Sequence, residues 1–257
     1  MGTWGSSSSG SGHRPSPPES IISYIPFSSR GGSLQLSVII PTMNEEESIG
    51  QVIDSVRQAL AGWDYEILVV DTNSKDRTRE IAMEKGAVVV EEPRRGYGRA
   101  YKTGFERAKG EVIATLDADC TYPAEEIPAL YGMLMERDLE FITTNRFARL
   151  EDGAMTAKHR LGNLALTLMT NVLFGVRIRD SQSGMWVFRR SILDRLVISA
   201  DGMPMSEEIK IEAFRKARSL EVPIAYRRRV GEVKLSSWKD GWMNMRFLFE
   251  KRFRRQR

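Results

Sequence analysis

The chain has 257 residues, 41% of them apolar and 28% charged, and its 38 Lys and Arg residues against 34 Asp and Glu residues give a formal net charge of +4. This is the composition of an ordinary soluble globular protein with room for a large core, and no apolar run approaches the roughly 20 residues that a membrane-spanning helix needs. The single cysteine, Cys120, excludes an intramolecular disulfide, and the two histidines, His13 and His159, lie far apart in sequence. A zinc site is therefore not expected, and any bound metal should have oxygen ligands.

The N-terminal segment, residues 1–33, has the composition of a disordered tail. Ser, Gly and Pro dominate it and no hydrophobic period is present. It has no basic start followed by an apolar stretch, so no secretory signal is expected.

From residue 36 to residue 116, segments typical of strands and helices alternate. Short runs rich in β-branched residues predict buried strands at 36–40 and 67–70 and further strands at 88–90 and 112–116. Apolar spacing and terminal glycines predict helices at 45–60, 76–85 and 100–109. This alternation predicts an α/β fold with a mostly parallel central sheet flanked by helices.

The second half is less regular. Its pattern predicts helices at 155–174 and 206–218 and strands at 185–188 and 222–226. We expect this half to lie against the end of the sheet and to wall off a site there.

Two aspartates, Asp117 and Asp119, directly follow the fourth predicted strand. Ligands of open α/β sheets bind beyond the carboxyl ends of the strands, where Glu45 and Asp71 follow the first two strands. Two carboxylates about 4 Å apart repel each other by about 4 kcal/mol at an effective dielectric near 20, and a divalent cation removes that penalty. Few hard oxygen ligands suit Mg²⁺ or Mn²⁺ that also binds a substrate diphosphate. A chance pair of surface carboxylates is the alternative.

Gly96 and Gly98 flank Tyr97 just before the third predicted helix. The segment lacks the full dinucleotide-binding spacing and the Lys-Ser/Thr pair of a phosphate loop, so a plain turn is an equal alternative. Lys102, one turn into the helix, is a candidate phosphate ligand, with an exposed helix face as the alternative.

Six segments carry a family resemblance when they are taken in order: 38–45, 69–76, 115–123, 180–190, 221–224 and 229–235. They resemble the inverting glycosyltransferases of family 2, which have the GT-A fold, and especially the dolichyl-phosphate mannose synthase group and its bacterial polyprenyl-phosphate relatives. The resemblance implies one GT-A domain over residues 34–237. Its nucleotide-sugar-binding half would be 34–123 and its acceptor half 124–237.

The resemblance also implies roles for individual residues. Together with Lys102, the expected nucleotide-sugar contacts are Pro41, Met43, Glu45, Asp71, Asp117, Ala118, Asp119, Arg229 and Lys234. Asp117 and Asp119 would hold the metal. The acceptor side would comprise Arg146, placed after the fifth strand, and Arg160, Gln182 and Ser183. Surface salt bridges are the alternative for the arginines, and a plain turn is the alternative for residues 182–184.

Four positions depart from the family pattern. Thr121 stands where a Gln often contacts the metal, Met43 where an aromatic residue is common, Thr72 where a second Asp is frequent, and Val233 where Ser is usual. These departures weaken GDP-mannose as the donor. They leave a nucleotide-sugar donor unaffected.

The expected reaction is inverting displacement at the anomeric carbon, with the sugar passing from a nucleoside diphosphate to a polyprenyl (dolichyl-like) phosphate. Mg²⁺ or Mn²⁺ would neutralise the departing diphosphate at Asp119. A phosphate acceptor is already anionic and needs only positioning. A soluble hydroxyl acceptor, the alternative, would need a general base, for which Asp180 and Glu208 are the candidates. Charge placement at a helix N-terminus is the alternative for Glu208.

The C-terminal segment, residues 238–257, is basic and amphipathic. Residues 227–257 carry eleven Lys and Arg against three Asp and Glu, a net charge of +8 that leaves the rest of the chain at −4. Trp242, Met245, Phe249 and Phe253 share one helical face. The pattern predicts either an interfacial helix on an anionic membrane or a final core helix with a basic end. We expect a cytoplasmic protein, peripheral on the cytoplasmic face of a membrane.

Three other functions compete with this interpretation. A nucleotidyltransferase would also use an α/β sheet with Mg²⁺, and a silent nucleotide-sugar sensor would keep the binding site without the chemistry. A nucleic-acid binder could use the basic tail, but no aromatic and basic surface for reading bases is evident, so no nucleic-acid partner is expected. The sequence gives no indication of the oligomeric state.

Overall fold

The structure, a computed structural model, describes residues 34–231 and 237–253, with the side chains of the last range from Asp240 onward. The tail predicted at 1–33, the candidate Lys234 and the basic residues after Phe253 lie outside these ranges. So does the departure at Val233.

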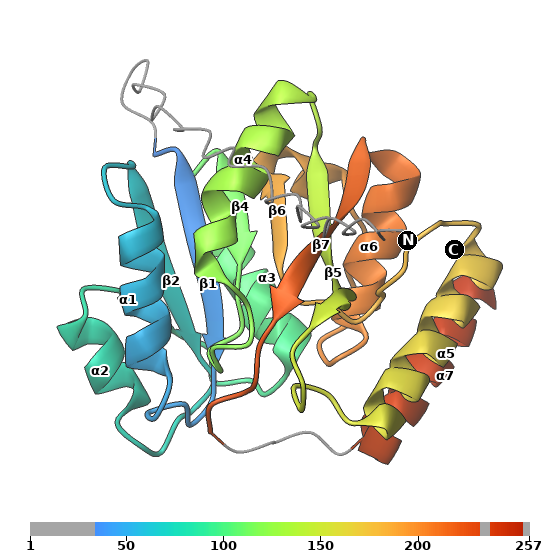
Figure 1. Cartoon of the computed structure of the whole chain (residues 1–257), viewed down its shortest axis with the longest axis horizontal. Helices are drawn as coiled ribbons and strands as arrows, with labels where there is room; N and C mark the ends of the chain where they lie inside the picture. The colour runs from blue at the N-terminus through green and yellow to red at the C-terminus, as the bar shows by residue number, and fades with distance from the viewer. Residues whose placement is uncertain (1–33, 232–236, 254–257) are drawn as a thin grey trace, which may run out of the picture.

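Four parallel strands form one half of the central sheet, and helices connect them (Figure 1). The strands are β1 (Leu36–Thr42), β2 (Tyr65–Asp71), β3 (Val88–Glu91) and β4 (Val112–Thr115). The connecting helices are α1 (Ile49–Ala59), α2 (Thr78–Glu84) and α3 (Tyr97–Arg107). All seven predicted elements of this half are confirmed, with ends shifted by a few residues. The apolar runs of β1, β2 and β4 suit strands that are buried on both faces, whereas β3 is a partly exposed edge strand.

The second half completes a seven-stranded sheet of order β3-β2-β1-β4-β6-β5-β7. Its elements are α4 (Ile127–Glu136), β5 (Phe141–Leu150), α5 (Ala157–Phe174), β6 (Trp186–Arg189), α6 (Met205–Lys216), β7 (Ser219–Tyr226) and α7 (Ser237–Phe253), with short 3₁₀ turns at Ala124–Glu126 and Arg190–Arg195. β6 runs antiparallel to both neighbours, and β5 and β7 are parallel. The sheet is therefore mostly parallel, as expected.

Arg146 lies within β5 and not after it, which corrects the placement inferred from the sequence. Pairing of β5 with β7 is regular up to Asn145, is interrupted, and resumes at Arg149. Irregularities of this kind redirect side chains from a strand. Arg146 stands in that interruption.

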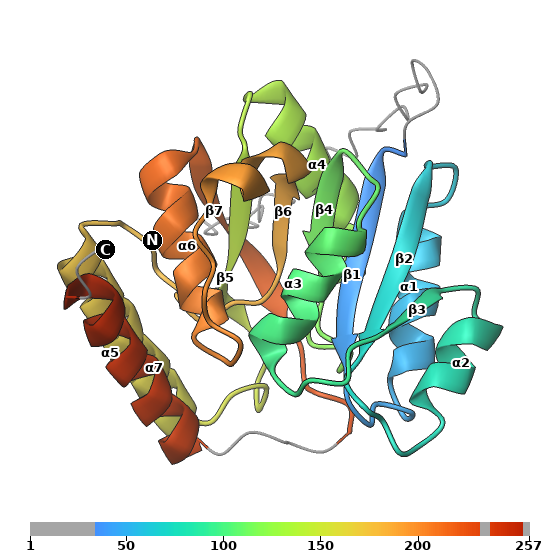
Figure 2. The ribbon, with the colours of Figure 1, turned by 180° about the vertical axis from the view of Figure 1, so that it is seen from behind.

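Helices cover both faces of the sheet (Figures 1 and 2). α1 and α4 bury apolar side chains against one face, and α3 and α6 against the other. The neighbouring residues Ile39 and Ile40 of β1 belong to opposite cores, as the period of two in a strand requires.

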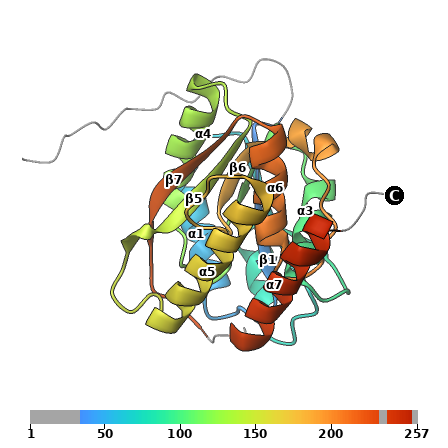
Figure 3. The ribbon, with the colours of Figure 1, turned by 90° about the vertical axis from the view of Figure 1, so that its right-hand side faces the viewer.

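α5 and α7 lie side by side at one end of the molecule (Figure 3). Leu166 of α5, Ile211 of α6 and Leu248 of α7 form a small separate core between them. This pair of helices flanks the half of the sheet that contains β5, β6 and β7.

The strand register fixes where the carboxylates emerge. β1 and β2 end level with each other, with Thr42 opposite Asp71. β4 ends at Thr115, opposite Ile39, so Asp117 and Asp119 follow beside the last residues of β1. Carboxylates from three strands therefore share one edge of the sheet, as the sequence predicted.

Candidate active site

Asp71 is buried at the end of β2 and organises the loop that follows. Its carboxylate accepts hydrogen bonds from Thr42 Oγ1 at 3.3 Å and from the backbone N–H of Ser74 at 3.1 Å. Nε of Arg79 lies 3.7 Å from Asp71 Oδ2. The carboxylate thus holds the loops after β1 and β2 in one geometry.

Backbone groups of the two loops are joined by side chains. The N–H of Asn44 donates to Ser74 Oγ at 2.8 Å, and the N–H of Glu45 donates to Thr78 Oγ1 at 2.7 Å. Asn44 itself adopts a left-handed conformation, with φ of 55°. This arrangement leaves three of the residues predicted to contact the nucleotide sugar partly exposed along the sheet edge: Pro41, Met43 and Glu45.

Asp119 is almost fully buried and accepts several hydrogen bonds. Thr121 donates to its Oδ1 from both the backbone N–H, at 3.1 Å, and Oγ1, at 2.6 Å. Nη2 of Arg229 lies 2.6 Å from its Oδ2. Thr121, one of the departures from the family pattern, therefore orients the acidic pair.

The segment after β7 brings Arg229 to this point. The N–H of Val230 donates to the carbonyl of Asp119 at 2.9 Å, and the N–H of Arg227 donates to the carbonyl of Thr121 at 3.0 Å. Arg229 thus lies beside the acidic pair, where a basic group can meet donor phosphates.

Asp117 accepts hydrogen bonds from two tyrosines of α3, at 3.2 Å from Tyr97 Oη and 3.4 Å from Tyr101 Oη. Burial, together with the charge of Asp119, raises the pKa of Asp117 to about 7. Sequence reasoning missed these tyrosines. Their spacing of four residues, which places both on one helix face, was the available signal.

The loop before β6 reaches the same carboxylate. The N–H of Gly184 donates to Tyr122 Oη at 2.7 Å. A Cβ at Gly184 would lie 2.3 Å from Tyr97 Oη and 3.3 Å from Asp117 Oδ1. Only glycine leaves room for this contact, so the segment 180–184 is not a plain surface turn.

Arg146 and Asp180 form a buried ion pair on the acceptor side. Nε and Nη2 of Arg146 lie 2.7 and 2.9 Å from the two carboxylate oxygens of Asp180, and the Arg146 N–H donates to Oδ2 at 3.1 Å. Burial alone would raise the pKa of Asp180, but the Arg146 guanidinium outweighs it and lowers that pKa. The guanidinium also lies 5.2 Å from the ring centroid of Tyr226. Asp180 is thus a partner of Arg146, which makes it a poor general base.

Gln182 and Ser183 are anchored within the same loop. Ser183 Oγ lies 2.6 Å from Thr144 Oγ1. The side-chain amide of Gln182 donates to Glu207 Oε1 and accepts from Asn244 Nδ2, the latter at 3.1 Å. Sequence reasoning missed Glu207, whose burial raises its pKa to about 8.

Glu208 is buried, and its carboxylate has several partners. It accepts from the N–H groups of Ser199 and Ala200 at 2.8 and 2.7 Å and from Ser199 Oγ at 2.9 Å, and Lys251 Nζ lies 2.9 Å away. Glu208 lies in the first turn of α6, as the alternative of charge placement at a helix N-terminus expects, and these contacts also order the chain before that helix. Its role as a base stays a prediction.

Two other candidates are not brought into the cluster by any described contact. Lys102 Nζ lies 2.5 Å from Asp201 Oδ1 and 3.2 Å from the carbonyl of Ser199. It follows Tyr101 directly and therefore points to a different face of α3 from the tyrosines. Arg160 is exposed in the first turn of α5, and its acceptor role stays a prediction.

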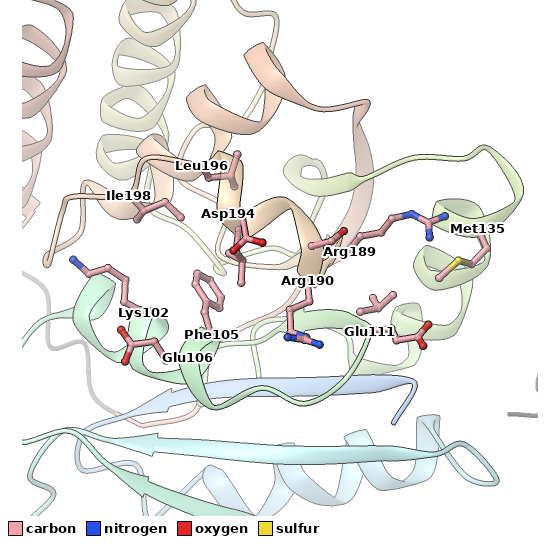
Figure 4. Close-up of a pocket in the computed structure, with 13 residues that line it drawn as sticks. Lys102, Phe105, Glu106, Glu111, Met135, Arg189, Arg190, Asp194, Leu196 and Ile198 are labelled. Atoms are coloured by element: carbon pink, nitrogen blue, oxygen red, sulfur yellow. The ribbon is translucent and has the colours of Figure 1, made fainter. Parts of the chain in front are cut away.

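A cavity of about 790 Å³ lies elsewhere on the molecule (Figure 4). Phe105, Val112 and Arg190 are among the residues that line it. Val112 begins β4, whereas Asp117 follows the end of that strand. The cavity is therefore at the opposite edge of the sheet from the acidic pair.

The acidic pair suits a divalent cation that a substrate helps to hold. Within residues 34–231 and 237–253, no group of three or more His, Cys, Asp and Glu side chains converges as a closed metal site. Asp117 and Asp119 offer hard oxygen ligands, and the raised pKa of Asp117 reflects its burial together with the charge of its neighbour. Such an open donor set fits Mg²⁺ or Mn²⁺ whose other ligands come from a diphosphate and water.

Residues 37–197 match the Glycosyl transferase family 2. The chain belongs to this family. It is 42% identical over 217 residues to the low-salt glycan biosynthesis hexosyltransferase Agl6 of Haloferax volcanii, covering 83% of this chain and 52% of that protein. It is 33% identical over 207 residues to a dolichyl-phosphate hexose transferase of the same organism, covering 80% and 89%. The chain thus spans about half the length of Agl6 and most of the second relative.

Solved structures confirm the GT-A fold of this family 2 glycosyltransferase. The glucosyl-3-phosphoglycerate synthase of Mycobacterium tuberculosis, determined with Mn²⁺, uridine diphosphate and glucosyl-3-phosphoglycerate, superposes with a TM-score of 0.68. It shares 21% identity, over 85% of this chain and 80% of that one. The resemblance inferred from the six sequence segments is confirmed.

Proposed function

We propose that this glycosyltransferase moves a hexose from a nucleoside diphosphate sugar to a polyprenyl phosphate, with inversion at the anomeric carbon and with Mg²⁺ or Mn²⁺ bound. The observation that carries the choice of acceptor is the Arg146–Asp180 pair. The pair places the buried guanidinium of Arg146 on the acceptor side, and the carboxylate of Asp180 is already engaged by that guanidinium. A phosphate acceptor needs such a cation and no base.

The relatives agree with this acceptor class. One is a dolichyl-phosphate hexose transferase, and a dolichol-phosphate mannosyltransferase of Pyrococcus furiosus is 29% identical over 221 residues, covering 79% of this chain and 59% of that protein. The soluble-hydroxyl alternative is less well supported, because its two candidate bases, Asp180 and Glu208, are engaged by Arg146 and Lys251.

Asp117 and Asp119 would hold the cation, which supplies Lewis-acid neutralisation of the departing diphosphate. The donor nucleoside would lie along Pro41, Met43 and Glu45. Arg229, beside Asp119, would meet the donor phosphates, with Lys234 following it in sequence. On the other side of Gly184, Arg146 would orient the acceptor phosphate for attack on the face opposite the leaving group.

The same proposal places the protein at a membrane surface. Exposed apolar residues line the outer sides of α5 and α7: Leu161, Leu168, Val172, Trp242, Phe249 and Phe253. Basic residues accompany them on α7, and such a face suits an anionic lipid interface. Within the described parts of the chain, no helix has the length and hydropathy required to cross a bilayer. Peripheral binding at the cytoplasmic face is the proposed location.

The test is a panel of nucleotide sugars incubated with a short-chain polyprenyl phosphate, with Mg²⁺ or Mn²⁺ or a chelator. Glycolipid formation that requires the metal and is lost in Asp119→Asn supports the proposal. Product formed only with soluble alcohols would favour the hydroxyl alternative. Equal product in chelator would refute the role of the metal.

A further inference from the structure

α7 has polar side chains on the side that faces the protein and large apolar side chains on the side that faces solvent. The side turned to the body of the protein carries Asp240, Asn244 and Lys251 beside the fully buried Leu248 and the half-buried Met245, which packs on the same small core. The outer side carries Trp242, which is 67% exposed, and Phe253. A surface helix of a soluble protein normally turns a wider apolar stripe to the core and a polar face to solvent. The helix is thus suited to a second environment that covers its outer face.

Some polar groups at the contact between α7 and the acceptor side have no hydrogen-bond partner. Asn244 donates to Gln182, and Gln182 donates to Glu207. Among the described side chains, two buried oxygen atoms at this contact have no hydrogen-bond partner, Glu207 Oε2 and Asn244 Oδ1, and Oδ2 of Asp240, one turn earlier on α7, also has none. Buried polar atoms without partners destabilise the arrangement that buries them.

The contact also engages Gln182, a residue that is expected to bind the acceptor. The side-chain oxygen of Gln182 is engaged by Asn244 while α7 is docked, and its side-chain nitrogen donates to Glu207 of α6 and to Ser181. Gln182 stands two residues before Gly184, which closes against Asp117. The docked helix therefore covers the loop that joins the acceptor side to the acidic pair.

Charged contacts hold the far half of the helix. Lys251 Nζ lies 2.9 Å from both Glu208 Oε1 and Glu212 Oε1 on α6. Anionic lipid headgroups offer the same chemistry to a lysine. The sequence around it adds Arg246 and Arg252, and continues with Arg254, Arg255 and Arg257. This charge complementarity identifies an anionic bilayer as the occupant of the outer face.

We propose that α7 is an autoinhibitory strap. In the docked state its polar side covers Gln182 and Glu207, and binding of its outer face to an anionic bilayer releases that contact and frees the acceptor side. The inference rests on the proposed function in one respect, namely that the bilayer is where the acceptor resides. The release itself is a property of the chain.

The first experiment measures release without using activity. Hydrogen–deuterium exchange of segments 180–184 and 205–208 is followed in the full chain, alone, with phosphatidylcholine vesicles, and with vesicles containing phosphatidylglycerol. Faster exchange in both segments only with the anionic vesicles is expected. Unchanged exchange in a protein that co-floats with those vesicles would overturn the strap.

The second experiment weakens the contact in Asn244→Ala and Lys251→Ala, with Glu250→Gln as the control, because Glu250 pairs only with the exposed Arg246. Both variants should show the faster exchange without vesicles, and a several-fold rise in vesicle-free transfer to a water-soluble short-chain polyprenyl phosphate. The control should match the wild type. Exchange that stays slow in both variants would contradict the strap. If no chain forms product under any condition, the proposed function fails, while the exchange result still decides the strap.

Discussion

Nη2 of Arg229 lies 2.6 Å from Oδ2 of Asp119. A guanidinium that is distant in sequence therefore neutralises the carboxylate that is expected to hold a metal ion. The contact arises because the segment after β7 pairs through its backbone with residues 119–121. In the absence of substrate, a cation bound at the acidic pair, as proposed, would compete with Arg229 for one carboxylate.

This competition predicts opposite effects of Arg229→Met on two ligands. Removing the guanidinium should tighten Mn²⁺ binding measured alone by about tenfold, since a charged hydrogen bond contributes roughly 1.5–3 kcal/mol. It should weaken binding of the nucleotide sugar, because its phosphates lose a partner. Isothermal titration of each ligand separates the effects. Arg227→Met, which removes an exposed partner of Glu125, is the control, and unchanged Mn²⁺ affinity in Arg229→Met would contradict the competition.

Gly184→Ala should lower transfer by roughly 100-fold, the effect of an ångström-scale displacement at a reacting centre. The new Cβ would stand 2.3 Å from Tyr97 Oη. Adding Tyr97→Phe removes that oxygen, so the double variant should recover part of the lost activity. Steady-state kinetics of the single and double variants measures this coupling.

Gly162→Ala on α5 is the matched control, because a Cβ at this position would meet no atom within 4 Å beyond its chain neighbours and the backbone of its own helix. It should leave activity unchanged and stabilise the fold by about 0.4–1 kcal/mol. A double variant no better than Gly184→Ala would show that the loop needs glycine for another reason.

The Arg146–Asp180 pair predicts a large and specific loss of stability. Asp180→Asn leaves Arg146 buried without its countercharge, which should lower the free energy of unfolding by about 3–5 kcal/mol. Asp180→Asn combined with Arg146→Met should recover much of that loss, but not the activity. Denaturant unfolding measures the first effect and transfer assays the second. Recovery of both would argue against a role for Arg146 at the acceptor.

The strands and the acidic pair could be predicted because local pattern determines them. Apolar β-branched runs specify the buried strands, and parallel strands bring Asp71, Asp117 and Asp119 to one edge whatever the loops do. The partners of these groups could not be predicted. Arg146 and Asp180 are 34 residues apart, and their pairing depends on an interruption within β5.

Helix rotation explains why the two neighbouring glutamates of α6 have different partners. Glu207 and Glu208 differ by about 100° around the helix axis. Glu208 turns to Ser199 and Lys251, whereas Glu207 turns to Gln182. Sequence reasoning favoured Glu208, because nothing local distinguishes two adjacent acidic residues until the tertiary partners are known.

The burial of Glu207 predicts a pH dependence that one substitution reduces. Its pKa of about 8 in the fold exceeds the ordinary 4.5, so the fold retains a proton that the unfolded chain releases, and stability falls as pH rises from 4.5 to 8. Asp117, with a pKa of about 7, contributes in the same direction. Lys210, whose burial lowers its pKa to about 7, acts oppositely only above that pH.

Between pH 5 and 7 the slope of stability against pH should therefore be less steep in Glu207→Gln, by about 1.4 kcal/mol per pH unit, the value for one proton. The glutamine is neutral without taking up a proton on folding, so the variant should be at least as stable as the wild type at pH 7. Urea unfolding of both proteins at pH 5, 6 and 7 measures the difference, and parallel slopes would show that Glu207 titrates normally in the fold.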